Sequence, residues 1–170
     1  KICKDPGFFN FNQFHNPDNI ECHYETTGAE ILEQTKGLPV AAFLDGTGTG
    51  GTLMGVSARL KERYPNIKTL AIEPAESPVM SGGEQGLHGI QGIGDGSKFL
   101  VDLDKVDEVL LVKTDDAIER MKQLHQRGLL VGISSGANVL ASERWIEKNN
   151  PDGIVVTILC DRGERYLSCL

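Results

Sequence analysis

The sequence lacks the cysteine and histidine spacings that mark common metal and redox sites. No C-x-x-C pair occurs among its four cysteines, which are Cys3, Cys22, Cys160 and Cys169. No H-E-x-x-H pair occurs among its four histidines, which are His15, His23, His88 and His125. These absences exclude the usual zinc and thiol-redox motifs, and a disulfide framework is not expected in a domain of this size. We therefore expect no metal ion and a cytoplasmic protein.

Long apolar runs and an excess of basic residues are also missing. No stretch approaches the roughly 20 apolar residues that cross a bilayer, so no membrane association is expected. The net charge of −7 argues against nucleic acid and anionic membranes as partners. The 170 residues are enough for a single domain with its own hydrophobic core.

Apolar strand-like segments alternate with helix-like segments along the chain. The expected strands span residues 40–44, 69–73, 107–113 and 154–160, and the expected helices span 24–36, 53–64, 114–127 and 134–148. This alternation predicts an α/β fold with a mainly parallel sheet. The last two helices are expected to begin at hydroxyl caps, Thr114 and either Ser134 or Ser135. Residues 74–97 are glycine-rich with little periodicity, which predicts a long functional loop.

Residues 45–52, Asp-Gly-Thr-Gly-Thr-Gly-Gly-Thr, join an expected strand to an expected helix. Glycines let backbone N–H groups converge on one point, threonines add hydroxyl donors, and the helix N-terminus adds partial positive charge. The loop therefore predicts a phosphate site. Its three threonines favour a terminal phosphate monoester over a pyrophosphate, because the monoester has more oxygens that need hydrogen-bond donors.

Two alternatives remain open for this loop on the residues alone. Residues 46–51 satisfy G-x-G-x-x-G, and Glu73 ends the next expected strand, as in dinucleotide-binding oxidoreductases that use NAD. A tight strand-to-helix turn without a ligand has the same pattern. A P-loop is excluded because no Gly-Lys-Ser/Thr segment occurs.

Six further segments occur in a fixed order around this loop. They are Asn12-Gln13-Phe14-x-Asn16-Pro17-x-Asn19, 25–31 (Glu-Thr-Thr-Gly-Ala-Glu-Ile), Glu73-Pro74-x-x-Ser77-Pro78-Val79, 90–94 (Ile-Gln-Gly-Ile-Gly), 132–137 (Gly-Ile-Ser-Ser-Gly-Ala) and 163–168 (Gly-Glu-Arg-Tyr-Leu-Ser). The series resembles the cysteine synthase (O-acetylserine sulfhydrylase) family of fold-type II pyridoxal-phosphate (PLP) enzymes, to which cystathionine β-synthase is related. The resemblance covers essentially the whole chain. It implies a three-layer α/β domain, the large PLP-phosphate-binding domain of the tryptophan synthase β-like fold.

The resemblance also implies roles for individual residues. The implied cofactor-binding residues are Gly48, Thr49, Gly50, Gly51 and Thr52 at the phosphate and Ser134 at the pyridine nitrogen. The implied substrate-binding residues are Gln13, Gln91, Gly92 and Ile93. Without the family, the serine pair is an ordinary helix cap and Gln13 an ordinary surface amide.

The segment 160–165 departs from the family pattern in part. Cys160 and Asp161 stand where Pro-Ser or Pro-Asp is common. Cys160 is expected either beside the cofactor ring or in the core, the commoner place for a free cysteine. Glu164 and Arg165 are expected to form an ion pair or a cap near the end of the sheet.

Two functional segments of the family have no counterpart in these residues. The Schiff-base lysine and a Thr-Ser-Gly-Asn-Thr segment lie upstream of the phosphate loop in the family, and Lys1, Lys4 and Lys36 do not match the lysine's context. That lysine anchors the cofactor and removes a substrate proton. We therefore expect residues 1–170 to be one domain, the C-terminal part of an enzyme whose smaller N-terminal domain carries the lysine. Alone, the chain is expected to be inactive.

For the complete enzyme, the resemblance implies β-replacement that forms L-cysteine from sulfide and O-acetylserine or O-phosphoserine. The leaving group is not decided by these residues. Alternatives are a cystathionine β-synthase or hydroxyamino-acid dehydratase of the same fold, and a non-catalytic PLP-binding fragment. Implied partners are a second copy in a homodimer and the C-terminal tail of serine acetyltransferase.

Overall fold

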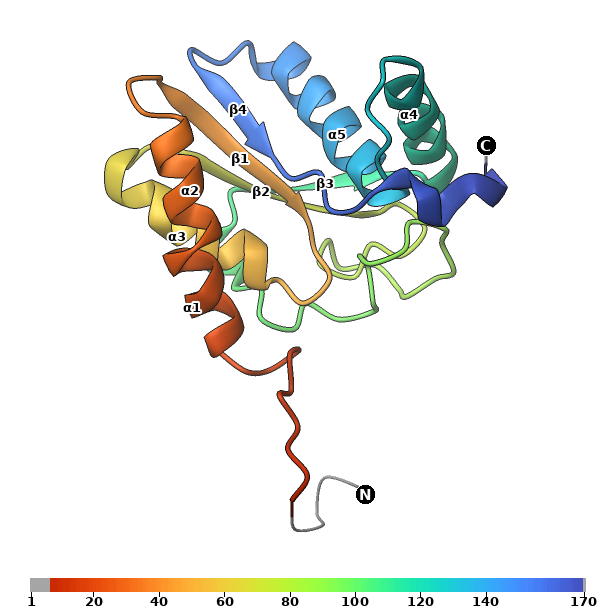
Figure 1. Cartoon of the computed structure of the whole chain (residues 1–170), viewed down its shortest axis with the longest axis horizontal. Coiled ribbons are helices and arrows are strands. Elements are labelled where there is room, and N and C mark those ends of the chain that lie inside the picture. Colours follow the sequence, from red (N-terminus) through yellow and green to blue (C-terminus); the bar gives the residue numbers. More distant parts are fainter. Residues whose placement is uncertain (1–6, 170) are drawn as a thin grey trace.

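The computed structural model describes residues 7–169, which form a four-stranded parallel sheet between two layers of helices (Figure 1). The strands are β1 (Val40–Gly46), β2 (Lys68–Pro74), β3 (Glu108–Val112) and β4 (Ile154–Thr157). The helices are α1 (Asp18–Glu25), α2 (Thr27–Gln34), α3 (Gly51–Arg63), α4 (Thr114–Gln126) and α5 (Ile133–Asn149). Short 3₁₀ segments span Leu103–Lys105 and Gly163–Cys169. Lys1, Cys3 and Lys4, considered above, lie outside the described residues.

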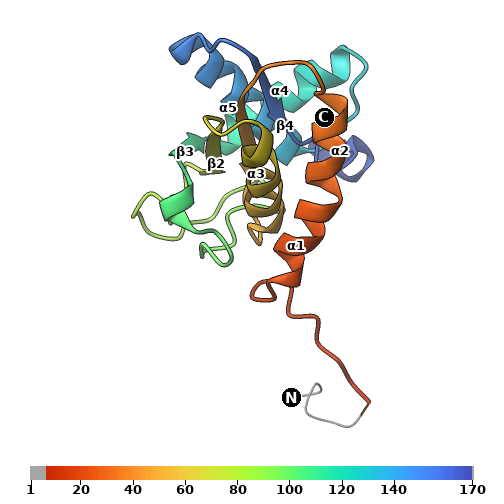
Figure 2. The ribbon, with the colours of Figure 1, turned by 90° about the vertical axis from the view of Figure 1, so that its left-hand side faces the viewer.

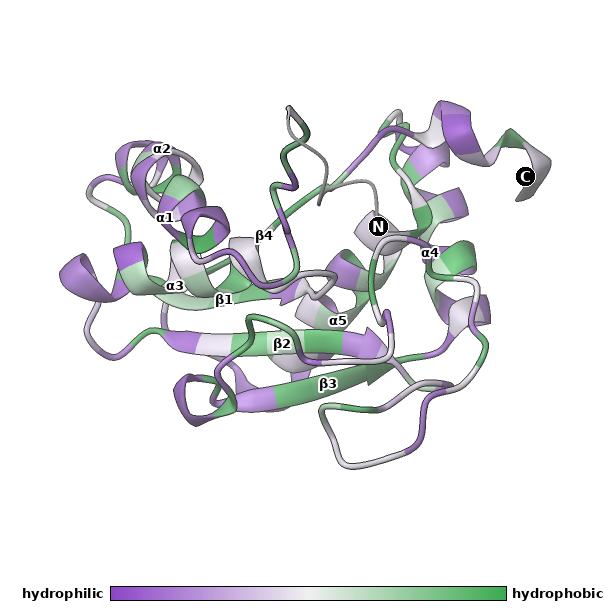
Figure 3. Cartoon of the chain, turned by 90° about the horizontal axis from the view of Figure 1, so that it is seen from below, coloured by the Kyte–Doolittle hydropathy of each residue, from purple (hydrophilic) through white to green (hydrophobic). Residues whose placement is uncertain are grey.

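Alternate strand residues pack on opposite faces of the sheet. Ala42, Leu44 and Ile72 belong to a core with α4 and α5, whereas Phe43 and Ala71 belong to a second core with α1, α2 and α3. Strands buried on both faces are typical of parallel sheets covered by helices. Figure 3 shows the resulting apolar stretches along β2 and β3. The expected three-layer α/β fold with a parallel sheet is therefore confirmed.

The strand order is β3-β2-β1-β4. From β1 the chain moves outward through β2 to β3, and it then returns to place β4 on the other side of β1. The order therefore reverses between β1 and β4. In open parallel sheets, ligands bind beside the carboxyl ends of the two strands at such a switch point.

The N-terminal region differs from the expected single helix over 24–36. The chain forms two short helices, because Thr26 has non-helical dihedral angles (φ −106°, ψ −83°) between α1 and α2. Helix α1 starts earlier than expected, directly after Pro17, whose fixed φ suits a helix start. Before it, the first of the described residues extend away from the body (Figures 1 and 2) and leave Phe9 and Phe11 largely exposed, whereas Phe14 contacts Phe99.

The two hydroxyl caps expected for α4 and α5 are wrong. The residues at the cap positions are Lys113 and Gly132, and neither helix has a side-chain capping bond. Thr114 Oγ1 instead accepts a bond from the Gly89 amide (2.9 Å). Ser135 Oγ accepts from the Cys160 amide (2.9 Å). Both hydroxyls bind neighbouring loops rather than their own helices.

Side-chain hydrogen bonds hold the backbone at two other places, and only the first of them, the end of β4, differs from the expectation. Strand β4 ends at Thr157 rather than 160, since the Ile158 carbonyl accepts from Asn138 Nδ2 (2.9 Å) instead of a strand partner. The loop after β2 is anchored by Glu73, whose carboxylate accepts from the amides of Met80 (2.8 Å) and Ser81 (3.0 Å). Glu73 is 2% exposed and thus unavailable to a ribose. No helix of the described residues is long and apolar enough to cross a membrane.

Candidate functional site

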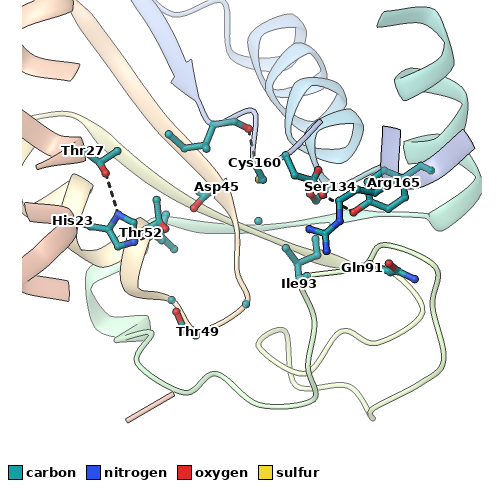
Figure 4. Close-up of a pocket in the computed structure, with 18 residues that line it drawn as sticks. His23, Thr27, Asp45, Thr49, Thr52, Gln91, Ile93, Ser134, Cys160 and Arg165 are labelled. Carbon is teal, nitrogen blue, oxygen red and sulfur yellow. Dashed lines mark hydrogen bonds between the residues drawn. The ribbon is translucent and has the colours of Figure 1, made fainter. Parts of the chain in front are cut away.

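A pocket of about 610 Å³ lies where the topology predicts a ligand, at the carboxyl ends of β1 and β4 (Figure 4). Its walls come from the loop after β1, residues 91–93, the start of α5 and the segment after β4. His23 and Thr27 close the side toward α1 and α2. The volume suits a small ligand or cofactor.

The loop after β1 lies close against the loop that carries residues 91–93. A Cβ on Gly48 would lie 2.5 Å from the carbonyl oxygen of Gly92, so only glycine fits there. Gly50 has a left-handed φ of +88°, which turns the chain into α3. The Leu100 amide donates to the Thr49 carbonyl (3.0 Å) and holds the two loops together. The glycines therefore form a narrow, rigid wall.

The Thr49 hydroxyl lines the pocket and already has two donors. Its Oγ1 accepts from Asn19 Nδ2 (3.1 Å) and from the Gly51 amide (3.2 Å). A hydroxyl whose oxygen accepts two bonds has its own hydrogen free to donate elsewhere. Together with the amides of Thr52 and Leu53 in the first turn of α3, which have no acceptor inside the helix, it provides donors for an anion.

Thr52 continues the donor set through a chain of polar side chains. His23 Nε2 lies 3.2 Å from Thr52 Oγ1, and its Nδ1 lies 3.1 Å from Thr27 Oγ1. Burial lowers the pKa of His23, which favours the neutral ring. With Nε2 protonated, Thr27 donates to Nδ1 and Nε2 donates to Thr52. The Thr52 hydrogen is then free for a ligand.

Gly51 and Gln13 do not line this pocket, unlike the other eight residues expected at the site. A Cβ on Gly51 would lie 1.9 Å from Asn19 Oδ1, so Gly51 makes room for the side chain that binds Thr49. Gln13 is exposed, and its carbonyl accepts from Asn19 Nδ2 (2.8 Å). Asn19, which the sequence placed in a family segment without a role of its own, thus connects Gln13 with the loop after β1.

Ser134 and Cys160 lie together on the opposite wall. Ser134 is 3% exposed and lines the pocket. Cys160 is not in the core but opens onto the pocket. Surrounding protein still raises the pKa of its thiol to about 11, with a further increase from the nearby Asp45 carboxylate and a decrease from a hydrogen bond to Ser134. The thiol therefore stays protonated at neutral pH.

Asp45, at the floor of the pocket, is a site residue that sequence reasoning missed. It is 4% exposed, and its Oδ1 accepts from Asn138 Nδ2 on α5 (3.1 Å). Burial raises its pKa to about 7, partly offset by the bonds from Asn138 and the Gly46 amide. Its position directly at the end of an apolar strand was the available signal.

The segment after β4 adds an acid, a phenol and a guanidinium. Tyr166 Oη donates to Asp161 Oδ2 (2.7 Å), and burial together with this acceptor raises the pKa of Tyr166 to about 12. Arg165 lines the pocket, whereas Glu164 pairs with Arg162 (3.2 Å). Of the expected ion pair or cap, Glu164 therefore forms an ion pair, with Arg162 and not with Arg165. Within residues 7–169, no three His, Cys, Asp or Glu side chains gather in a metal-binding cluster.

These features define a class of protein with a parallel α/β fold and two kinds of polar group in one pocket. Thr49, Thr52 and the first turn of α3 form a site for an anion, called the anion cup below, and the buried Ser134 hydroxyl lies on the opposite wall. A family model described as "Pyridoxal-phosphate dependent enzyme" matches residues 1–161. The chain is 45% identical to a cysteine synthase from Staphylococcus aureus, over 99% of this chain and 55% of that protein. It is 42% identical to cysteine synthase B from Campylobacter jejuni, over 98% of this chain and 56% of that protein.

Solved structures agree in fold. A hydrogen sulfide-producing enzyme from Fusobacterium nucleatum superposes with a TM-score of 0.94 at 40% identity, covering 98% of this chain and 52% of that one. Cysteine synthase from Entamoeba histolytica gives 0.91 at 42% identity, covering 98% and 50%. The chain therefore belongs to the pyridoxal-phosphate-dependent enzymes, in the cysteine synthase (O-acetylserine sulfhydrylase) family. It spans about half the length of these relatives.

The pocket fits the family's cofactor chemically. Its threonine hydroxyls and the first turn of α3 suit a phosphate monoester, and glycines keep Cβ atoms out of that wall. Ser134 supplies a neutral hydroxyl on the opposite wall. The dinucleotide alternative loses its support for two reasons. The Glu73 carboxylate accepts hydrogen bonds from the Met80 and Ser81 amides, and the matching family model describes PLP-dependent enzymes.

Proposed function

We propose that this chain is the cofactor-cradling part of an enzyme that forms L-cysteine by β-replacement on an O-activated serine. The observation that carries the proposal is the pairing, within one pocket, of an anion cup and a buried hydroxyl. PLP, when bound, supplies an electron-withdrawing ring that makes the substrate's α-proton acidic and its β-substituent a leaving group. The similarity to cysteine synthases supports sulfide as the incoming nucleophile.

In this proposal, Thr49, Thr52 and the first turn of α3 hold the cofactor phosphate. The glycines at positions 48, 50 and 51 allow close approach of the backbone and of Asn19. Ser134 binds the pyridine nitrogen as a neutral partner, which does not hold a proton there as a carboxylate would. Gln91, Gly92 and Ile93 face the amino-acid substrate from the opposite loop. Gln13 is proposed to bind the same substrate, and its carbonyl is linked to Thr49 through Asn19.

We further propose that the covalent anchor and proton-abstracting lysine lie outside these 170 residues, in a smaller domain of the complete enzyme. The chain alone then binds PLP without a covalent bond and does not turn over. Borohydride reduction with PLP, followed by peptide mapping, tests this directly. A specifically labelled lysine within the chain would contradict it.

Four further proposals rest on the family resemblance alone. They are a homodimer, a cytoplasmic location, O-acetylserine or O-phosphoserine as the amino-acid substrate, and binding of the C-terminal tail of serine acetyltransferase. A second candidate reaction is the formation of cystathionine. It is favoured by the similarity to an O-acetylserine-dependent cystathionine β-synthase from Helicobacter pylori (36% identity, TM-score 0.87, 97% of this chain and 54% of that one).

Product analysis of the complete enzyme separates these reactions. We expect L-cysteine from sulfide with O-acetylserine or O-phosphoserine, and little product from homocysteine. Cystathionine as the dominant product would favour the second candidate. Absence of PLP binding by the chain, measured by absorbance during equilibrium titration, would overturn the proposal as a whole.

A further inference from the structure

Asp45 lies at the floor of the pocket, and none of the ion pairs formed within residues 7–169 involves it. Asn138 Nδ2 donates to its Oδ1, and the same amide group also donates to the Ile158 carbonyl and contacts Cys160 Sγ (3.6 Å). No lysine or arginine of the described residues pairs with the Asp45 carboxylate. In the view of Figure 4, its side chain lies between Thr52 and Cys160. A buried carboxyl in such a place is favoured in its neutral form.

The neighbouring elements bring one further carboxyl group to the pocket, that of Asp161, which accepts from Tyr166 Oη, and one guanidinium, that of Arg165. His23 of α1 and Cys160, Asp161, Arg165 and Tyr166 of the segment after β4 line the same pocket. The ring of His23 is disfavoured in its charged form, and the thiol and phenol titrate well above neutrality.

Elements other than α1 and the segment after β4 add no free charge to the pocket. On β2, Glu73 is occupied by the loop that follows it. Helix α5 offers only the neutral Ser134 and Asn138, and the loop at 91–93 only neutral residues. Arg165, exposed at the rim, is the one permanent cation among the pocket-lining residues described. It forms no bond to Asp45.

Resting on the proposed function, we infer that Asp45 couples cofactor binding to proton uptake: an anionic ligand in the cup requires the Asp45 carboxyl to be neutral. The physical reason is that a phosphate dianion would share one pocket of about 610 Å³ with an ionised carboxylate that is itself only 4% exposed to water. Below neutral pH the carboxyl already carries its proton, so binding takes up none there. Above neutral pH the incoming anion brings a proton from solution to Asp45, and affinity falls as pH rises.

The test is calorimetric titration of the 170-residue chain with PLP in buffers of different ionisation enthalpy, which counts protons independently of catalysis. At about pH 8, we expect wild type to take up about one more proton than Asp45→Asn. Wild-type affinity should fall by up to about tenfold per pH unit above pH 7 relative to the variant, and the two should converge near pH 6. Glu164→Gln, which removes an exposed carboxylate beside the pocket rim, should match wild type.

The outcomes separate the role of Asp45 from the proposed cofactor site. Equal proton uptake by wild type and Asp45→Asn, with PLP bound by both, would overturn the role of Asp45 and leave the cofactor site intact. The role of Asp45 would also be overturned if Glu164→Gln lost the same proton uptake as Asp45→Asn. No PLP binding by wild type at any pH would overturn the proposed function and this inference with it. If Asp45→Asn does not fold, Asp45→Ala removes the same carboxyl without facing an amide toward Asn138.

Discussion

Asn19 Nδ2 donates to Thr49 Oγ1 at 3.1 Å and thereby joins the N-terminal segment to the loop after β1. The same nitrogen donates to the Gln13 carbonyl at 2.8 Å. One amide therefore orients a cup hydroxyl and fixes the backbone near a residue expected to bind substrate. The contact shows how segments 30 residues apart in sequence share one site.

Replacing Asn19 with alanine should weaken PLP binding. The Thr49 hydroxyl loses a donor that orients it, and a hydrogen bond of this kind contributes about 1 kcal/mol, or roughly a fivefold change in Kd. Fluorescence titration of PLP measures the effect. Asn16→Ala is the matched control, because the Asn16 side chain bonds Phe11 and Asp18 and does not reach the cup. Equal affinities for the two variants would contradict this role.

The double variant Thr49→Val with Thr52→Val should bind PLP more weakly still. Each valine keeps the shape of threonine but removes a hydroxyl donor, and each loss to a charged acceptor costs about 1.5–3 kcal/mol. Equilibrium titration gives the change in Kd. Thr157→Val serves as the control, since its hydroxyl bonds the Leu44 carbonyl outside the pocket. Unchanged affinity in the double variant would count against the phosphate assignment.

Gly48→Ala should destabilise the fold as well as the cup. The new methyl group would lie 2.5 Å from the Gly92 carbonyl oxygen, so two loop backbones must separate, at a cost of about 1–3 kcal/mol. Urea unfolding measures the loss. Gly37→Ala, with a φ of +82° and open space around its Cβ position, isolates backbone strain from collision. Because Gly48 has no left-handed φ, a loss below about 0.5 kcal/mol at Gly48 would show that the loops adapt freely.

Asp45 should make stability depend on pH. Its pKa rises from an ordinary value of 3.8 to about 7 on folding, so between these values only the folded chain holds the proton. The contribution of Asp45 to the free energy of unfolding is therefore largest in acid. It falls as pH rises from about 4 to 7, by at most about 1.4 kcal/mol per pH unit. Asp45→Asn should gain stability relative to wild type across that window and stay level above it.

Urea unfolding near pH 4.5 and pH 7.5 checks the dependence on Asp45. Asp152→Asn removes an exposed carboxylate between α5 and β4. The free energy of unfolding of this control variant should differ from that of wild type by the same amount at both pH values. A difference between Asp45→Asn and wild type that does not change with pH would rule out a shifted titration at this position.

Cys160 should react slowly with iodoacetamide at neutral pH although it opens onto the pocket. Only the thiolate attacks, and a pKa of about 11 leaves little of it. Cys22, exposed on α1, is the internal comparison. Mass spectrometry of timed digests follows both sites. Faster labelling at Cys160 than at Cys22 would show that the thiol is more acidic than its surroundings indicate.

The sequence by itself determined the layers of the fold and the character of the phosphate loop. Both depend on local patterns: apolar strands alternating with helices, and glycines with threonines before a helix. The ordered segments also indicated the family, because they fix residue types at many separate positions. The early start of α1 and the break at Thr26 were not predicted, since only backbone dihedral angles and packing against α3 define them.

Only the tertiary structure decided which side chains meet in the pocket. Asp45 and Asn138 are 93 residues apart, and they come together because α5 packs on the face of the sheet beside β1. The hydroxyls of Thr114 and Ser135, expected as caps, bind loops that folding brings within reach. Arg165 turns to the pocket while Glu164 pairs with Arg162. Local pattern specifies elements, but long-range contacts determine which polar groups are buried, paired or left open to a ligand.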